Sequence, residues 1–258
     1  MQYEVPHLPM HPISNIAMTP SDSPARPWRS RFATVNPRAY LGLHGLGGVL
    51  IVTALLWAFG AIVDAVGEKG AMVNLDVVVA DWLQSHGSEA GESIFSLVSW
   101  IGAPVLAAVL VIVMVAFAIK RDWVRTTAVA SAGVGGALLS YAMKALFHRG
   151  RPDFATEFIH GTSWSFPSGH AMDSLAGYGV LAYLLLEVTH EKGRRRAIIA
   201  TTIVLVGAIG FSRLYLGVHY LSDVVGGYIA GAVWLLVCIV GYRFAASHRF
   251  DAGSYPGS

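Results

Sequence analysis

The stretch LVSWIGAPVLAAVLVIVMVAFAIKR, residues 97–121, decides the fold of this chain. Residues 97–119 contain no charged side chain, and about 20 predominantly apolar residues are enough for a helix to cross the hydrocarbon core of a membrane. Lys120 and Arg121 follow at once, and basic residues next to a span favour the cytoplasmic side. The stretch therefore predicts a membrane-spanning helix that ends in the cytoplasm.

The composition of the whole chain is that of a protein with several such helices. Of its 258 residues, 54% are hydrophobic and 13% are charged, whereas about 25% of the residues of an ordinary soluble domain are charged. We therefore predict an all-α, polytopic membrane protein that forms a bundle of six transmembrane helices. The predicted spans lie at about 41–63, 97–119, 124–146, 170–188, 197–216 and 221–242.

The segments outside the spans give further expectations. Residues 1–38 are rich in Pro, Ser and Arg and are predicted to form a disordered tail. Residues 39–243 form the six-span domain, and residues 244–258 form a second tail. Segment 71–92 is expected to contain a short helix, either at the membrane interface or packed on the bundle. One face of that helix carries Leu75, Val78, Val79, Trp82 and Leu83.

Basic residues orient the chain in the membrane. Most of the 18 Lys and Arg residues lie in the two tails and in the connections between spans two and three and between spans four and five. Both termini are therefore predicted to be cytoplasmic, in the cell's inner (plasma) membrane. The net charge of +2 is nearly neutral and argues against a nucleic-acid partner. The single cysteine, Cys238, excludes an internal disulfide and argues against a cysteine-ligated metal site.

Four basic residues break this pattern, because the predicted topology places Lys144, Arg149, Arg151 and Arg213 on the outer side. Charges at a membrane edge are costly and are therefore candidates for function. Lys144 and Arg151 are seven residues apart, about two helical turns, so they share a face while the helix continues. The alternative for this pair is that the long side chains only extend from the membrane edge to water.

A second group of polar residues lies in SFPSGHAMDS, residues 165–174. Pro167 and Gly169 are typical of a turn, and Ser168 can cap a helix that begins near His170. The free backbone N–H groups of a first helical turn bind anions, phosphate above all. Ser caps before helices are common, so this motif alone is not specific.

The third group is SRLYLGVHYLSD, residues 212–223. His219 and Asp223 are four residues apart, so on a helix the carboxylate can accept a hydrogen bond from one ring nitrogen. The other ring nitrogen is then free to act as a nucleophile. A purely structural His–Asp pair is the alternative interpretation.

The predicted topology places all three groups at outer ends of spans. Three cations that lie close together repel one another unless an anion lies between them. A phosphoryl group is the natural anion for a site of this kind, since it also suits a helix N-terminus.

These residues carry a resemblance to a known family. The sequence resembles the type 2 phosphatidic acid phosphatase superfamily of integral membrane lipid phosphatases, and it departs from the three-part family signature at no position. The matching residues are Lys144, Arg151 and Pro152; then Pro167, Ser168, Gly169 and His170; then Ser212, Arg213, His219 and Asp223.

The resemblance implies a role for each signature residue. It implies that His219 attacks phosphorus to give a phosphohistidine, that Asp223 fixes the tautomer of His219, and that His170 is the general acid. It also implies that the phosphate is held by Lys144, Arg151, Ser168, Gly169 and Arg213. No metal and no cofactor is expected.

The implied substrate is a lipid phosphate or diphosphate in the bilayer, at the outer face. Undecaprenyl diphosphate, phosphatidylglycerophosphate and phosphatidic acid all fit the motifs equally well. A phosphotransferase that uses the same site and a transporter that binds the anion without chemistry are the alternatives. Among the other polar residues, His148 and Arg149 are expected at the rim or in solvent, and Asp173 either tunes His170 or interacts with the helix dipole.

Overall fold

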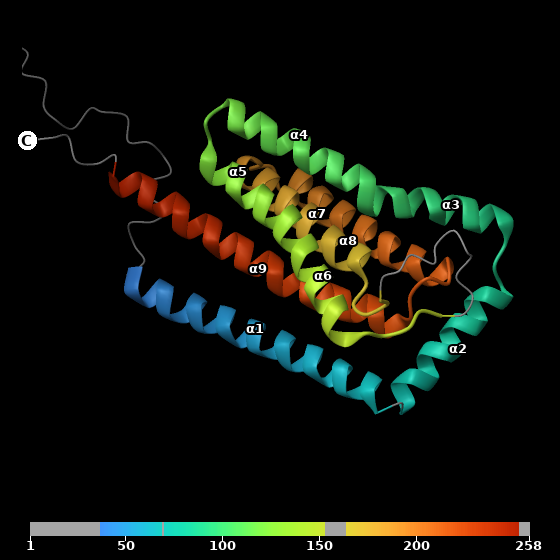
Figure 1. Ribbon diagram of the computed structural model, residues 1–258. Coiled ribbons are helices and arrows are strands. Elements are labelled where there is room, and N and C mark those ends of the chain that lie inside the picture. Colours follow the sequence, from blue (N-terminus) through green and yellow to red (C-terminus); the bar gives the residue numbers. More distant parts are fainter. Residues whose placement is uncertain (1–36, 69, 153–163, 253–258) are drawn as a thin grey trace, which may run out of the picture. The chain divides into compact units, whose positions relative to one another are not determined.

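The computed structural model describes residues 37–68, 70–152 and 164–252, and all regular secondary structure in these ranges is helical (Figure 1). The helices are α1 (Pro37–Gly67), α2 (Ala71–Ser85), α3 (Glu89–Trp100), η2 (Ile101–Val105), α4 (Leu106–Ile119), α5 (Trp123–Ala130), η3 (Ser131–Gly135), α6 (Gly136–Phe147), α7 (Gly169–Val188), α8 (Lys192–Tyr215) and α9 (Leu221–Ala252).

The chain divides into two compact units, residues 1–48 and 49–258, with the boundary inside α1. The described part of the first unit is the start of α1. The second unit holds the rest of α1 and all the other helices. The predicted N-terminal tail falls almost entirely on residues 1–36, which lie outside the described residues, and Pro37 and Arg38 are already helical.

Six helical segments are long and apolar enough to cross a membrane, which confirms the predicted six spans. They are Leu46–Gly67, Glu89–Ile119, Trp123–Phe147, Gly169–Val188, Lys192–Tyr215 and Leu221–Ser247. Large apolar side chains face outward from them, such as Trp57 (76% exposed) and Ile119 (77% exposed). The last helix continues to Ala252, so the first residues of the predicted C-terminal tail prolong it.

The second span begins well before the predicted residue 97. Its first helix, α3, starts after Ser88, whose side chain accepts a hydrogen bond from the backbone N–H of Gly91 at 3.1 Å. Glu89 and Glu92 in the first turn favour the positive end of the helix dipole. A capped, acidic first turn thus lengthens the span beyond its apolar core.

Spans two and three each contain a turn of π-helix, η2 and η3, where continuous α-helix was expected. η2 contains Pro104, which has no N–H to donate, and a π turn accommodates such a residue inside a long helix. η3 is the glycine-containing segment SAGVG. Both turns contact α7.

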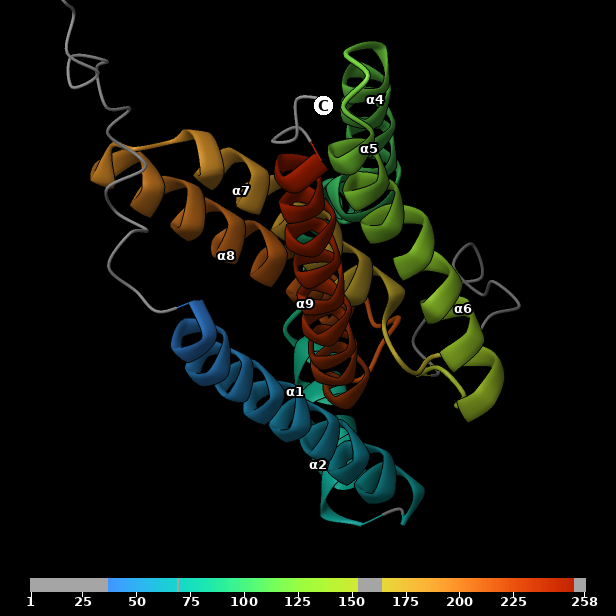
Figure 2. The same ribbon diagram turned by 90° about the vertical axis from the view of Figure 1, so that its left-hand side faces the viewer.

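Helix α7 lies among the other helices of the second unit and packs against α4, α5, α6, α8 and α9 (Figures 1 and 2). Small residues in α9 permit the close approach of these two helices. A Cβ atom on Gly227 would lie only 2.6 Å from the backbone oxygen of Ser168, and one on Gly231 would lie 2.7 Å from that of Met172. The start of α7 is therefore held against the backbone of α9.

Helix α2 is the short helix expected in segment 71–92, and it packs on α8 and α9. The predicted apolar face is divided in the structure. Leu83 is buried, together with Asp76 and Ala80, whereas Val78 and Trp82 are exposed. The helix thus packs on the bundle through one face and leaves apolar side chains uncovered on another.

Candidate active site

The signature residues gather where four helix ends meet. Successive spans run in opposite directions, so the C-terminal ends of α6 and α8 and the N-terminal ends of α7 and α9 lie on the same side of the membrane. Lys144 is in the last turn of α6 and Arg213 in the last turn of α8. Gly169 begins α7, and Asp223 is in the first turn of α9.

Two positions with positive φ end the helices and turn the chain into the site. His148 adopts a left-handed conformation, with φ 47°, directly after α6. Gly217, with φ 64°, turns the chain after α8, and the backbone N–H of Val218 donates to the oxygen of Arg213 at 3.2 Å. This turn brings His219 back over the end of α8.

His219 and Asp223 form a buried pair, with exposed fractions of 3% and 0%. The distance from His219 Nδ1 to Asp223 Oδ2 is 3.4 Å, and the Ser165 hydroxyl lies 3.3 Å from the same Nδ1. Ser165 donates its own proton to Asp223 Oδ2. The Asp223 carboxylate can only accept a hydrogen bond. The Ser165 oxygen has donated its own proton, so it can only accept a hydrogen bond from Nδ1. Nδ1 therefore carries the ring proton, and Nε2 keeps a lone pair.

The pair lies before α9 and in its first turn, rather than on one continuous helix as the spacing suggested. Asp223 Oδ2 also accepts the backbone N–H of Tyr220 at 2.8 Å, so its carboxylate caps the start of α9 while it contacts His219. Burial lowers the pKa of His219 from 6.5 to about 4, and the nearby Asp223 carboxylate offsets this effect only in part. The imidazole is therefore neutral at physiological pH.

The three signature cations are anchored by oxygen atoms around the site. Lys144 Nζ donates to the backbone oxygens of Trp164 and Ser165 at 2.7 and 3.3 Å. Arg151 donates to the backbone oxygen of Val218 at 2.9 Å, and Arg213 donates to the hydroxyl of Ser99. Lys144 is close enough to Arg151 and to Arg213 for their positive charges to repel one another. The structure therefore brings the three positive charges together. Because like charges repel one another, such an arrangement favours the binding of an anion between them.

His170 lies among the same charges. It interacts electrostatically with Arg213, His219, Arg151 and Lys144. A Cβ atom on Gly102, in η2, would lie 3.3 Å from its ring. The two signature histidines are thus in one site, with His170 against the second span.

Two buried polar atoms of signature residues lack a partner among the described residues. They are the Ser168 hydroxyl oxygen and Arg213 Nε. Ser168 occupies the N-cap position of α7, but its side chain makes no cap hydrogen bond, so the expectation that it caps the helix was wrong. The backbone N–H groups at the start of α7 still point out of the helix by its geometry.

The expectation that Arg149 lies at the rim or in solvent was wrong. Its side chain is 13% exposed and forms ion pairs with Asp223 at 2.6 Å and with Asp76 at 2.8 Å. His148 is exposed and contacts the Trp164 ring, as a rim residue does. The sequence signals for the missed pair were the outer-side position of Arg149 and the presence of Asp76, one of two acids in the otherwise mostly apolar helix α2. Ser165 gave no signal.

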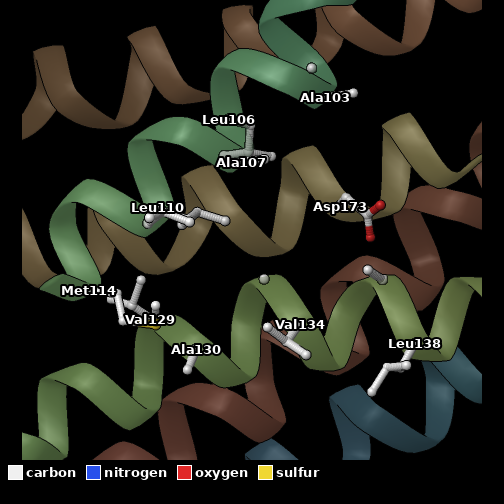
Figure 3. Close-up of a pocket in the computed structure, with 14 residues that line it drawn as sticks. Ala103, Leu106, Ala107, Leu110, Met114, Val129, Ala130, Val134, Leu138 and Asp173 are labelled. Atoms are coloured by element: carbon white, nitrogen blue, oxygen red, sulfur yellow. The ribbon is translucent and has the colours of Figure 1, made fainter.

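An apolar cavity of about 490 Å³ lies between η2–α4 on one side and α5–η3–α6 on the other. Figure 3 shows Leu106, Leu110, Val134 and Leu138 along it, with the carboxylate of Asp173 at one end. Asp173 follows His170 by three residues on α7, so the cavity reaches the neighbourhood of the turn at the start of that helix. One carboxylate oxygen of Asp173 is buried without a partner among the described residues.

Comparisons with known proteins bear on the family. A stretch of 96 residues is 41% identical to phosphatidylglycerophosphatase B of Bacillus subtilis (strain 168); it covers 36% of this chain and 46%, less than half, of that protein. The fold is similar to that of the first transmembrane PAP2 type phosphatidylglycerolphosphate phosphatase from Bacillus subtilis, with a TM-score of 0.67 over 80% of this chain and 98% of that chain, at 24% sequence identity. Residues 123–246 match the model of the PAP2 superfamily. All three signature motifs lie inside these residues, which are just under half of the chain, and in them the chain is similar to the PAP2 superfamily.

Proposed function

We propose that this protein is a lipid phosphatase that hydrolyses a lipid phosphate or diphosphate through a phosphohistidine intermediate. The observation that carries the proposal is the pair of unpartnered polar atoms, Ser168 Oγ and Arg213 Nε, beside three cations. A buried polar group without a hydrogen bond costs about 1–3 kcal/mol. A phosphoryl group offers the acceptor oxygens that Arg213 needs and the negative charge that the cations need.

The first chemical step forms a bond between nitrogen and phosphorus. The lone pair of His219 Nε2 attacks phosphorus in line with the leaving oxygen, and the bond from phosphorus to that oxygen breaks. His170 gives its proton to the oxygen, which leaves as the lipid alcohol, or as the lipid monophosphate when the substrate is a diphosphate. Asp223 stabilises the positive charge that develops on the His219 ring.

The second step hydrolyses the intermediate. Water attacks phosphorus, His170 takes a proton from that water, and the electrons of the N–P bond return to Nε2. Lys144, Arg151 and Arg213 hold the equatorial oxygens, where charge accumulates in both transition states. These side chains supply the charge stabilisation that other phosphatases obtain from metal ions, and we propose that hydrolysis needs no metal or other cofactor.

The apolar cavity supports a lipid as the substrate. Its walls are aliphatic, and its end at Asp173 is close in sequence to the phosphate-binding turn, so a chain attached to a bound phosphate can lie in it. The relative named phosphatidylglycerophosphatase B supports a glycerophospholipid phosphate. Undecaprenyl diphosphate is the other substrate that we propose to test, at the outer face of the inner membrane.

The test is phosphate release by the purified full-length protein in detergent micelles that contain EDTA. The panel holds phosphatidylglycerophosphate, phosphatidic acid and undecaprenyl diphosphate. We expect release from at least one of them, with its complete loss in His219→Ala. His190→Ala, in the exposed connection between α7 and α8, is the matched control and should keep full activity.

Three outcomes would contradict parts of the proposal. Near-normal turnover by His219→Ala would exclude the phosphohistidine. Loss of activity in EDTA that returns with a divalent metal would exclude metal independence. Transfer of the phosphoryl group to an added alcohol with no release of inorganic phosphate would identify a phosphotransferase.

A further inference from the structure

A buried ion-pair network adjoins the His219–Asp223 pair. Its centre is Arg149, in the segment after α6. One guanidinium nitrogen donates to Asp223 Oδ1 at 2.6 Å and to the Ser222 hydroxyl at 2.6 Å, and the other donates to Asp76 Oδ2 at 2.8 Å. Asp76 and Asp223 are both 0% exposed. One cation therefore serves two fully buried carboxylates.

The network connects three separate parts of the chain. Asp76 belongs to α2 and accepts the backbone N–H of Ser222 at 2.9 Å, so it holds the start of α9. Arg149 also lies 4.6 Å from the centre of the Tyr220 ring, in a cation–π arrangement. A guanidinium fork that makes several directed contacts has little freedom to move. Its position is fixed from two helices.

The two carboxylate oxygens of Asp223 have different partners as a result. Oδ1 is occupied by Arg149, whereas Oδ2 contacts Ser165, the Tyr220 N–H and His219. Rotation of the carboxylate would break both sets of contacts at once. The orientation that presents Oδ2 to His219 Nδ1 is therefore the one that Arg149 selects.

We propose that Arg149 and its anchor Asp76 are positioning residues for phosphoryl transfer. Arg149 holds Asp223 in the orientation that keeps the proton on His219 Nδ1 and the lone pair on Nε2. Asp76 fixes Arg149 from α2. This inference rests on the proposed function, in which His219 is the nucleophile.

The network gives α2 a part in catalysis. Its buried face carries Asp76, while Leu75, Val78 and Trp82 on the same helix are 46%, 63% and 57% exposed. A displacement of α2 moves Asp76 and, through Arg149, the carboxylate of Asp223. Helix α2 is thus connected to His219, the proposed nucleophile, through the contacts of Asp76, Arg149 and Asp223.

The test must separate positioning from simple stability, because removal of Arg149 leaves two buried carboxylates without a counter-charge. Arg149→Gln alone is expected to lower both the melting temperature and kcat. In the double variant Arg149→Gln with Asp76→Asn, one of the two unpaired charges is gone. We expect its melting temperature to recover by at least half, while kcat stays about 10- to 100-fold below wild type and KM changes by less than about threefold.

Two single variants complete the set. Asp76→Asn keeps the pair between Arg149 and Asp223 but loosens Arg149, and it is expected to reduce kcat about two- to fivefold; an unchanged kcat would contradict the role of Asp76. Arg125→Gln removes an arginine that pairs with Asp122 at 2.9 Å, at the opposite end of the spans, and should leave kcat unchanged. If kcat of the double variant recovers together with its melting temperature, the role of Arg149 is structural and the proposal is wrong.

A second measurement does not depend on turnover. Nitrogen-15 NMR of the His219 ring should show a single tautomer with the proton on Nδ1 in wild type, and a mixture of tautomers in the double variant. An unchanged tautomer there would overturn the inference even if no substrate has been found. Absence of phosphate release by wild type from every lipid would instead contradict the proposed function, so the two failures are distinguishable.

Discussion

The Ser168 hydroxyl is buried, yet no hydrogen bond to the described residues satisfies it. The folded state carries this cost of about 1–3 kcal/mol, which a bound phosphoryl oxygen would offset. Ser168→Ala should therefore raise the melting temperature slightly while it lowers kcat/KM by about 10-fold, or about 1.4 kcal/mol of transition-state binding. Thermal unfolding and phosphate release, measured on the same preparation, check both effects.

Ser174 provides the matched control on the same helix. It is also buried, but its hydroxyl donates to the backbone oxygen of Ala171 at 3.2 Å. Ser174→Ala should leave kcat/KM unchanged and should not raise the melting temperature. A Ser168→Ala protein that loses stability and activity together would show that the hydroxyl serves the fold.

The lowered pKa of His219 makes a prediction about protonation. The folded pKa is about 4, against 6.5 for the ordinary side chain, because burial disfavours the charged ring. Above pH 6.5 the ring is neutral in both folded and unfolded states. As the pH falls from 6.5 to 4, only the unfolded state gains the proton, so the free energy of unfolding contributed by this group decreases by about 1.4 kcal/mol per pH unit.

NMR titration of carbon-13-labelled histidine rings measures this directly. The signal of His219, assigned by its loss in His219→Asn, should titrate with a midpoint near 4. A midpoint near 6.5 would mean that water reaches the ring more freely than the structure shows, and that the proposed nucleophile becomes protonated in mildly acidic conditions.

At the scale of the elements, the site depends on how closely α9 approaches the start of α7. A Cβ atom at position 227 would lie 2.6 Å from the Ser168 backbone oxygen and 3.1 Å from Ala171 Cβ. Backbone atoms cannot give way as a flexible side chain does, so the two helices must separate. Gly227→Ala should therefore lower the free energy of unfolding by about 1–3 kcal/mol through overpacking, which lowers the melting temperature, and it should reduce phosphate release about 10-fold.

The same helix contains the control. A Cβ atom at Gly241 would meet nothing within 4 Å, so Gly241→Ala tests the effect of alanine in α9 without a clash. It should leave activity unchanged and should not lower the melting temperature, since alanine favours helix over glycine. Equal loss in both variants would show that α9 tolerates no change in composition, which contradicts a local clash.

The same elements show what sequence could and could not predict. Apolar length predicts all six spans, and the alternation of spans predicts that Lys144, His170 and Arg213 lie on one side. The π turns η2 and η3 were not predicted, although Pro104 inside η2 is a local signal for an irregular helical turn. The pairing of Arg149 with Asp76 was missed because no local pattern joins two residues that are 73 positions apart.

The His219–Asp223 pair was predicted only in part. Its spacing predicted the contact correctly, but for a continuous helix. In the structure His219 precedes α9, and the contact forms because Asp223 reaches back over the first turn to Tyr220 and His219. Short-range spacing thus identified the partners, while the local backbone between them depends on the turn at Gly217.

At the scale of the whole molecule, the unequal distribution of basic residues is the argument for orientation. The site-side end of the spans holds a few cations, whereas the opposite connections hold Lys120 and Arg121 and the run Arg194–Arg196. Because the connections richer in Lys and Arg remain in the cytoplasm, we propose that the active site faces outward.

Cysteine labelling tests this orientation, and the chain is well suited to it. Its single cysteine, Cys238, is 5% exposed and can be replaced by alanine. Into that background, one variant introduces Ser85→Cys, at the exposed end of α2 on the site side, and another introduces Arg121→Cys, in the exposed connection after α4.

A membrane-impermeant maleimide added to intact spheroplasts should label the Ser85→Cys protein at once and the Arg121→Cys protein only after lysis. The variant without cysteine gives the background signal. The reverse pattern would place the three anchored cations and both signature histidines in the cytoplasm. The substrate would then have to come from the inner leaflet, and the basic residues of the connections would have crossed the membrane against the positive-inside rule.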